Sequence, residues 1–271
     1  MRGLMLESER RRLIVKLVNE RAIVAIGDFV EMLDASEATI RRDIATLDRN
    51  GELRRVRGGA EALNPRFQPH LVGSPFLISR EVQTEQKRAI AAIAATLLDG
   101  CQSIIMNAGT TTFELARLMG ERDLDVLTNS FSIASELFAN SRCRVTVPGG
   151  AIYREHNIIL SPFENDASTN FAGEYIFTSC YGVSPAGLTE TDPLIAQAAR
   201  KLFNRAAKVV VLVDSRKLRL RSSMVIAPLE EIDILITDDG AAEEEIAAIR
   251  AADIEVRIAT VGEKDALHKI A

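Results

Sequence analysis

The sequence predicts an α/β protein that carries a small, separate, all-α head at its N-terminus. Apolar residues recur at helical spacing through the first 50 residues, and a proline-containing stretch follows at 64–79. After residue 100, short β-branched or apolar runs alternate with helical segments. We therefore expect a head at residues 1–63, a linker at 64–79, and a larger domain at 80–271 built on a mostly parallel sheet.

The head is expected to begin with three helices. Apolar spacing predicts a first helix at 7–20 and a second, short helix that carries apolar residues from 26 to 33. Ser36 is a good N-cap for a third helix at 37–49, which ends at Asn50-Gly51. The tight turn between the second and third helices is typical of a helix-turn-helix.

A short hairpin is expected directly after the third helix. Residues 52–62 show the pattern of two short strands, with Gly58-Gly59 at the turn. The hairpin is rich in arginine, and a basic hairpin after a helix-turn-helix makes the winged variant of this DNA-binding fold. The head is therefore a winged-helix head, and its expected partner is double-stranded operator DNA.

The side chains expected to contact DNA lie on the third helix and in the hairpin. Those at the start of the helix can reach phosphates or base edges in the major groove, and those in the hairpin can hold the flanking backbone. The alternative is a small helical bundle whose arginines form an ordinary solvated face. The expected DNA-binding residues are Ser36, Thr39, Arg41, Arg42, Arg54, Arg55 and Arg57.

The charge of the chain is divided between its parts. The total of −5 combines a head, residues 1–63, with 12 basic and 11 acidic residues, and a remainder with 21 basic and 27 acidic residues. DNA binding therefore depends on basic residues gathered on one surface of the head. The sequence shows no membrane span and no signal peptide, and its three widely spaced cysteines favour a reducing, cytoplasmic compartment without a structural metal.

The larger domain is expected to start with a helix at about 81–98 and to continue in βα order. Seven short runs have the composition of buried strands. They lie at 103–106, 125–128, 143–147, 175–179, 208–213, 232–236 and 254–258. A turn of small residues, 107–112, follows the first of these strands and opens a helix from Phe113 to Met119.

Polar or glycine-rich segments end five of the expected strands. In a parallel sheet these ends meet at one edge, where open α/β folds bind their ligands. The turn at 107–112 also offers backbone N–H groups at a helix N-terminus, which suit a phosphate. Each segment alone has a structural turn as its simpler explanation. The five segments are Asn107–Thr112, Thr128–Ser130, Pro148–Gly150, Tyr181–Val183 and Asp214–Lys217.

Two contiguous stretches of the head resemble the DeoR family of transcriptional regulators. Ser36–Ile44 with Leu47 is similar to the family pattern S-x-x-T-[IV]-R-R-D-[IL], and Gly51–Ala60 is similar to G-x-[LI]-x-R-[VT]-x-G-G-A. The family often has histidine where this chain has Arg57. Two further stretches, Leu160–Pro162 and Phe177–Ser179, look closest to the branch of the family that represses ascorbate utilisation.

The resemblance extends over nearly the whole chain and implies a second domain similar in fold to ribose-5-phosphate isomerase. It implies a sugar phosphate as effector, with the phosphate at Gly109–Thr112. The sequence departs from many members at Asn107, where they have aspartate, and at Ile195-Ala196, where they have Glu-Ala. The expected effector-binding residues are Asn107, Gly109, Thr110, Thr111, Thr112, Thr128, Asn129, Ser130, Gly149, Gly150, Arg154, Tyr181, Gly182 and Lys217.

The expected function is that of a repressor of a sugar-catabolic operon whose DNA affinity is controlled by a phosphorylated sugar. We expect neither an enzyme nor a cofactor, and we expect a homodimer or homotetramer joined through residues 80–271. A sugar-phosphate isomerase with a DNA-binding appendage, using Asp214 and Lys217 as acid and base, is the alternative, and an architectural DNA-binding protein without a ligand is a third possibility. His156, near Arg154, is a candidate for the pocket or for an ordinary surface position.

Overall fold

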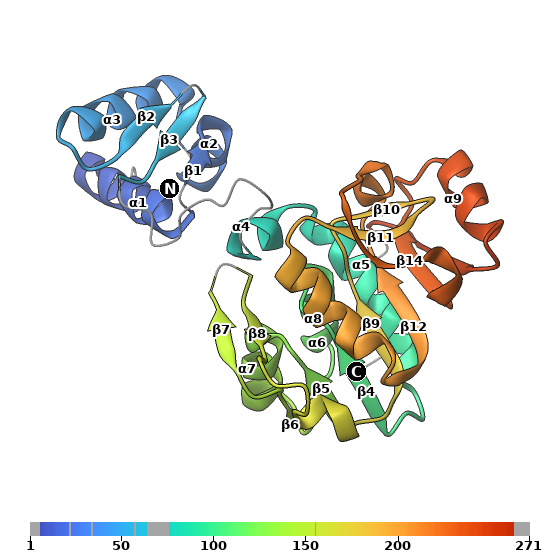
Figure 1. Cartoon of the computed structure of the whole chain (residues 1–271). Coiled ribbons are helices and arrows are strands. Elements are labelled where there is room, and N and C mark those ends of the chain that lie inside the picture. The colour runs from blue at the N-terminus through green and yellow to red at the C-terminus, as the bar shows by residue number, and fades with distance from the viewer. Residues whose placement is uncertain are drawn as a thin grey trace. The chain divides into compact units, whose positions relative to one another are not determined.

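The computed structural model of the chain describes residues 6–262 apart from 22, 34, 57, 64–75 and 155. The chain divides into two compact units, Met1–Ile78 and Ser79–Ala271, and each is described by itself (Figure 1). Most of the expected linker, residues 64–75, lies outside the described residues.

The three helices expected in the head are present as α1 (Glu7–Arg21), α2 (Ile26–Leu33) and α3 (Glu37–Arg49). The Ser36 hydroxyl caps α3, because its oxygen accepts a hydrogen bond from the Thr39 backbone N–H at 3.3 Å. The apolar faces of the helices enclose one core, in which Phe29 and Ile40 are completely buried.

The head also contains a three-stranded antiparallel sheet, so the expectation of an all-α head is wrong in this respect. The hairpin expected from the sequence is formed by β2 (Arg54–Val56) and β3 (Gly59–Glu61). The strand β1 (Ile23–Ala25) pairs with the other side of β3 and was not expected, since three residues between two helices carry no strand pattern. Gly59 permits this pairing, because a Cβ atom there would lie 2.2 Å from the Val24 carbonyl oxygen.

A buried carboxylate joins α3 to α1. Asp43 is 2% exposed, and its two oxygens accept hydrogen bonds from Arg10 Nε at 2.6 Å and Arg11 Nε at 2.9 Å. A buried carboxylate is costly unless it is paired in this way. The ion pairs therefore fix one flank of α3 against the first helix.

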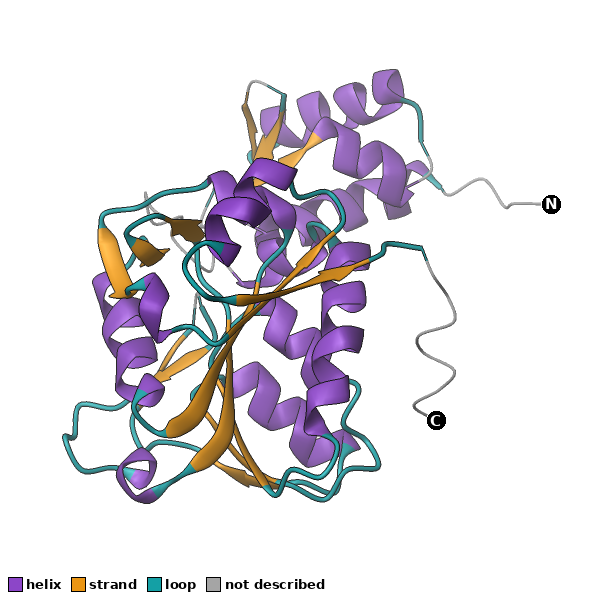
Figure 2. Ribbon diagram, turned by 90° about the vertical axis from the view of Figure 1, so that its right-hand side faces the viewer, coloured by secondary structure: helices purple, strands orange, loops and turns teal. Residues whose placement is uncertain are grey.

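The second unit is built on a seven-stranded sheet, and every neighbouring pair in it is parallel. The strand order is β15-β14-β12-β9-β4-β5-β6, and helices lie on both sides of the twisted strands (Figure 2). All seven strands expected from the sequence are confirmed. They are β4 (Ser103–Met106), β5 (Asp125–Thr128), β6 (Arg144–Thr146), β9 (Gly173–Thr178), β12 (Ala206–Leu212), β14 (Ile234–Asp238) and β15 (Glu255–Ala259).

Two small antiparallel sheets accompany the main sheet and were not expected. One is the hairpin of β7 (Ala151–Tyr153) and β8 (Ile158–Leu160). The other consists of β10 (Gly182–Ser184), β11 (Gly187–Glu190) and β13 (Met224–Ala227). Strands of three or four residues have too little alternation to stand out from loops in the sequence.

The helix expected at 81–98 is interrupted. The structure has α4 (Phe76–Glu81), then α5 (Thr84–Ala95) and a 3-10 turn, η1 (Thr96–Leu98). Gln83 separates the two helices, because its backbone adopts the left-handed conformation with φ = 55°. The prediction of one continuous helix is therefore wrong at its N-terminal end.

The remaining helices lie in the connections between strands. The helix expected from Phe113 begins three residues earlier, at Thr110, because the threonines belong to its first turn. Among the described residues, no helix is both long enough and apolar enough to cross a membrane. The remaining elements are α6 (Thr110–Ala116), α7 (Phe131–Asn140), α8 (Pro193–Phe203) and α9 (Glu243–Arg250), with the 3-10 turns η2 (Ala167–Asn170), η3 (Ser215–Arg219) and η4 (Leu229–Glu231).

Two adjacent glycines before β7 allow a test of the close contact between Gly150 and the backbone at Leu160. Gly150 has φ = +154°, and a Cβ atom there would lie 2.1 Å from the Leu160 carbonyl oxygen, whereas nothing lies within 4 Å of a Cβ at Gly149. We expect Gly150→Ala to destabilise the second unit by about 1–3 kcal/mol and Gly149→Ala to change its stability by less than about 0.5 kcal/mol. Urea denaturation followed by circular dichroism measures both, and equal effects would contradict the contact.

Candidate DNA-binding surface and ligand site

Two arginines of the head present unpaired guanidinium groups to solvent. Arg42 lies about 200° around α3 from the buried Ile40, so it points away from the core. Arg55 lies on β2, where only its backbone N–H is bonded, to Asp48 Oδ1 at 2.9 Å. Neither side chain is in contact with an acid among the described residues, and both are exposed. They are free to bind phosphates or base edges.

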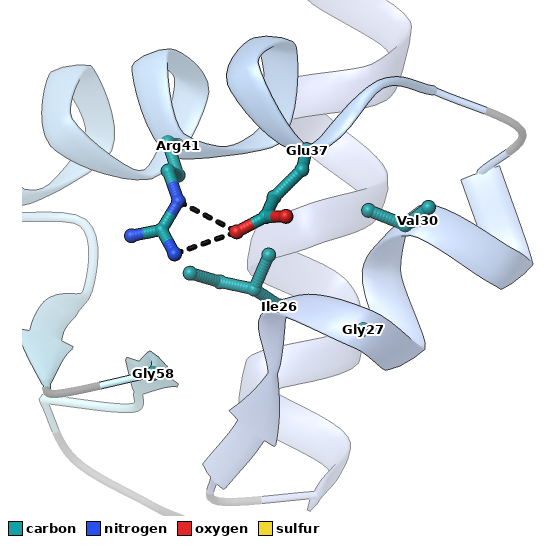
Figure 3. A pocket seen from close by; sticks show the side chains of 6 residues that line it. All are labelled: Ile26, Gly27, Val30, Glu37, Arg41 and Gly58. Carbon is teal, nitrogen blue, oxygen red and sulfur yellow. Dashed lines mark hydrogen bonds and ion pairs between the residues drawn. The ribbon is translucent and has the colours of Figure 1, made fainter.

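Two other expected DNA contacts are ion-paired. Arg41 donates from Nε and Nη2 to Glu37 Oε1, at 2.9 and 2.6 Å, and Arg54 Nη1 lies 2.9 Å from Glu61 Oε1. The Arg41–Glu37 pair lines a hollow of about 350 Å³, together with the N-terminal half of α2 and Gly58 of the wing. Both side chains point from α3 toward Ile26 (Figure 3).

The two hydroxyl side chains expected at the interface bind each other. Ser36 Oγ and Thr39 Oγ1 are 2.8 Å apart, in addition to the capping bond from the Thr39 N–H. Their local role is therefore to start α3, and a contact with DNA stays a prediction. Arg57, the seventh expected contact, lies outside the described residues.

In the second unit, the parallel sheet brings the ends of β4, β5 and β9 together through an amide network. Asn129 Nδ2 donates to Asn107 Oδ1 at 2.8 Å, and Asn107 Nδ2 donates to Thr178 Oγ1 at 2.9 Å. Asn129 Oδ1 accepts from the Ala108 N–H at 2.8 Å. Both asparagines are 2% exposed, so their amides hold the three strand ends in place.

The hydroxyl groups expected at this edge also serve the local structure. Thr112 Oγ1 donates to backbone carbonyls, with Asn107 O and Gly109 O each at 2.9 Å. Thr128 Oγ1 donates to Met106 O at 2.7 Å and accepts from the Ser130 N–H at 3.0 Å, and the Ser130 hydroxyl caps α7. These residues shape the loops more than they offer free donors.

The turn at Gly109 lies against the end of β9. A Cβ atom at Gly109 would lie 3.0 Å from both Ser179 Cβ and Thr112 Oγ1, so the glycine permits this close approach. Lys217, from η3 after β12, donates through Nζ to Ser179 Oγ at 3.2 Å and to Cys180 O at 2.6 Å. A cation and the start of α6 therefore face the same serine. Gly109 is the N-cap of α6 and has no side chain, so no capping side chain accepts a hydrogen bond from the first N–H groups of the helix.

A second lysine close to this edge was missed in the sequence. Lys87 of α5 is 2% exposed, and its Nζ donates to the carbonyls of Ser79 and Val82, across the break between α4 and α5. Burial lowers the pKa of Lys87 to about 8, and the positive charge of Lys217 adds to this effect. A single lysine in an alanine-rich helix is the only signal that the sequence contains.

Among the described residues, the segments after β4 and β12 each contain a buried oxygen without a hydrogen-bond partner: Thr111 Oγ1, in the first turn of α6, and Asp214 Oδ2. Thr111 is completely buried and Asp214 is 1% exposed. Buried polar atoms in native proteins are nearly always satisfied, so these two atoms are exceptions.

The other expected effector residues lie around this centre. The hairpin of β7 and β8 is bonded to the end of β5, through the Ile159 N–H and Asn129 O at 2.7 Å, and it carries the exposed Gly149, Gly150 and Arg154. Tyr181 is half-buried, and its N–H is bonded to Thr189 O at 3.0 Å. Close packing requires glycine at position 182, since a Cβ atom there would lie 2.2 Å from Leu220 O.

Both units match family models. The DeoR-like helix-turn-helix domain matches residues 10–66, and the DeoR C terminal sensor domain matches residues 82–239. This chain belongs to the DeoR family. The regulators named UlaR of Escherichia coli (strain K12 / DH10B) and of Shigella boydii serotype 18 are each 32% identical to it over 255 residues, which is 93% of this chain and 99% of theirs.

Membership of the DeoR family makes the protein a helix-turn-helix transcriptional regulator with a sensor domain. The match to UlaR agrees with the branch that Leu160–Pro162 and Phe177–Ser179 resemble. Among solved structures, ribose 5-phosphate isomerase A from Methanocaldococcus jannaschii is similar with a TM-score of 0.36 and 16% identity, over 48% of this chain and 52% of that one.

The difference between paired and unpaired arginines leads to a prediction for DNA binding. We expect Arg42→Ala to weaken operator binding by about 1–3 kcal/mol. Arg55→Ala should weaken binding to all sequences about equally and lower the salt slope by roughly one, whereas Arg54→Ala should lower it by less, because Glu61 already neutralises Arg54. Gel-shift titration at several salt concentrations measures these effects. Equal slopes for the two wing variants would contradict the ion-pair argument.

Proposed function

We propose that this protein represses a sugar-catabolic operon, and that a phosphorylated sugar bound at the carboxyl edge of the sensor sheet controls its affinity for the operator. The phosphate lies at the start of α6, at Gly109–Thr112, and the sugar hydroxyls face Asn129, Tyr181 and Lys217. The head at 1–63 binds DNA, and the part at 80–271 binds the ligand and joins two or four copies of the chain in the cytoplasm.

The observation that carries this proposal is the meeting of Gly109, Ser179 and Lys217 at one edge of a parallel sheet. The first N–H groups of α6 and the Lys217 ammonium both favour an anion. The unpartnered hydroxyl of Thr111 adds a buried donor in the same turn. A phosphate has enough acceptor oxygens to bind several of these groups at once.

A ligand controls DNA binding only if the two states of the regulator bind it with different affinity. Lys87 supports a route for this coupling. Its charge acts on Lys217 and Asp214 at the ligand edge, while its Nζ holds the break between α4 and α5 through Ser79 and Val82. This break lies at the start of the sensor domain. A ligand that attracts or repels the Lys87 ammonium therefore strengthens or weakens its bonds to Ser79 and Val82.

A thermal-shift screen against a panel of sugar phosphates tests the proposal. A ligand that binds only the native state raises the melting temperature, by an amount that grows with its concentration over Kd. We expect at least one sugar phosphate to raise the melting temperature and to change operator binding in a gel shift, while the unphosphorylated sugar does neither. If no member of a broad panel has an effect, the proposed effector class is wrong.

Gly109→Asp should separate ligand binding from DNA binding. The substitution places a carboxylate beside Ser179 and Thr112, where the phosphate is proposed to bind. We expect the variant to bind operator DNA as wild type does and to lose affinity for the sugar phosphate by at least about 2 kcal/mol. Calorimetry measures the loss. Wild-type ligand affinity in the variant would mean that the site lies elsewhere.

The lowered pKa of Lys87 predicts that ligand affinity depends on pH. A dianion at the edge favours the protonated lysine and raises its pKa, so binding takes up a proton when the pH is above about 8. We expect affinity to fall by up to about tenfold between pH 7 and pH 9. Calorimetry at both values measures the fall, and Lys87→Met should bind with a flatter pH profile. An identical profile in the variant would remove Lys87 from the site.

A further inference from the structure

The ion pair between Glu37 and Arg41 stands out among the charged contacts of the head. Both residues lie in the first part of α3, which is the part that enters the major groove in a helix-turn-helix. Their side chains are 60% and 51% exposed, so the pair contributes little to stability. A carboxylate at this place also opposes the phosphates of DNA. The helix dipole favours an acid in the first turn of α3, but it does not require that acid to be bonded to Arg41.

The geometry of the pair leaves one edge of the arginine available. Arg41 uses Nε and Nη2 to bind Glu37 Oε1, and its Nη1 has no partner among the residues that the structure describes. A guanidinium group is planar, so a carboxylate bound at the edge of Nε and Nη2 leaves Nη1 and the second hydrogen of Nη2 together on the terminal edge, about 120° away. These two donors match the O6 and N7 acceptors of guanine.

The surroundings leave room for such a contact. The pair lies beside the hollow of about 350 Å³, between the start of α2 and the wing turn at Gly58. Gly27 in this wall has nothing within 4 Å of where a Cβ would lie, so the hollow is open there. Figure 3 shows Arg41 between α3 and the wing, held on one side by Glu37.

We propose that Glu37 is a specificity-determining residue: it positions Arg41 so that the free edge of the guanidinium reads one guanine in each half-site. This inference rests on the proposed assignment of Arg41 to the DNA surface. Without Glu37, the long arginine side chain takes several conformations and binds phosphates as readily as bases. Glu37 therefore lowers the affinity for DNA in general and raises the discrimination between sequences.

Selection from a random 24-base-pair duplex pool, with the full-length protein, tests this proposal. Wild type should prefer guanine at one position that Arg41→Ala no longer distinguishes. Glu37→Ala should lose preference at the same position by about 5-fold or more, while binding a non-selected duplex more tightly than wild type does. Glu37→Gln should retain much of the preference, because an amide oxygen still accepts both bonds, yet it should share the tighter non-selective binding.

The controls separate positioning from charge and from folding. Glu9→Ala removes an exposed glutamate from the first turn of α1, with the same change of net charge, and should leave the preference unchanged. Adding Glu37→Ala to Arg41→Ala should cause no further loss of discrimination. Circular dichroism should be unchanged in every variant.

Two results would overturn the inference. One is a Glu37→Ala variant that selects the same sequences as wild type. If Arg42→Ala changes the selected sequences in the same experiment, the head still binds DNA and only the role of Glu37 is wrong. The other is a loss at a position different from that of Arg41→Ala. If wild type itself selects no sequence, the proposed DNA surface fails as well.

Discussion

Parallel pairing of all seven strands is the constraint on which the sensor domain depends. A parallel strand cannot be reached by a tight turn, so each connection must cross back over the sheet before the next strand begins. Every strand therefore ends at the same edge, and the segments after β4, β5, β9 and β12 meet there although they are far apart in the sequence. The bonds from Asn129 to Asn107 and from Asn107 to Thr178 tie the ends of β4, β5 and β9 together at this edge.

In the head, the contacts of α3 hold this helix in a fixed orientation and leave its charged surface exposed. One flank of α3 is fastened by a buried carboxylate, Asp43, between two arginines of α1. The other flank has an exposed pair that water can compete with. The buried pair therefore fixes where the helix lies, and in our proposal the exposed pair positions Arg41 for contact with DNA. The buried pair fixes structure, whereas the exposed pair contributes little to stability, because burial differs.

The sequence predicted those features that depend on long or strongly patterned segments. The seven strands and the three helices of the head carry clear apolar periodicity, and one family motif lies on α3 while the other covers the wing. The sequence could not show the left-handed backbone at Gln83, since glutamine rarely adopts this conformation and nothing in the residue type predicts it. It also could not show that Asn107 and Asn129 bind each other, or that Lys87 folds back onto Ser79 and Val82, because these contacts form only once the chain is folded. Residue type alone suggested free donors where the structure has satisfied ones.

The amide network also explains how the domain tolerates asparagine at position 107, where many members of the family have aspartate. Asn107 Oδ1 is an acceptor in its bond from Asn129, and a carboxylate would serve there unchanged. Its Nδ2 is a donor to Thr178 Oγ1, and that hydroxyl has Ser179 O 3.2 Å away. A hydroxyl can turn its hydrogen toward either neighbour, so exchanging the two residue types requires one rotation about a C–O bond and no change of backbone. This position is therefore one at which a lineage can remove a negative charge from the ligand edge in a single step, while the scaffold around it stays the same.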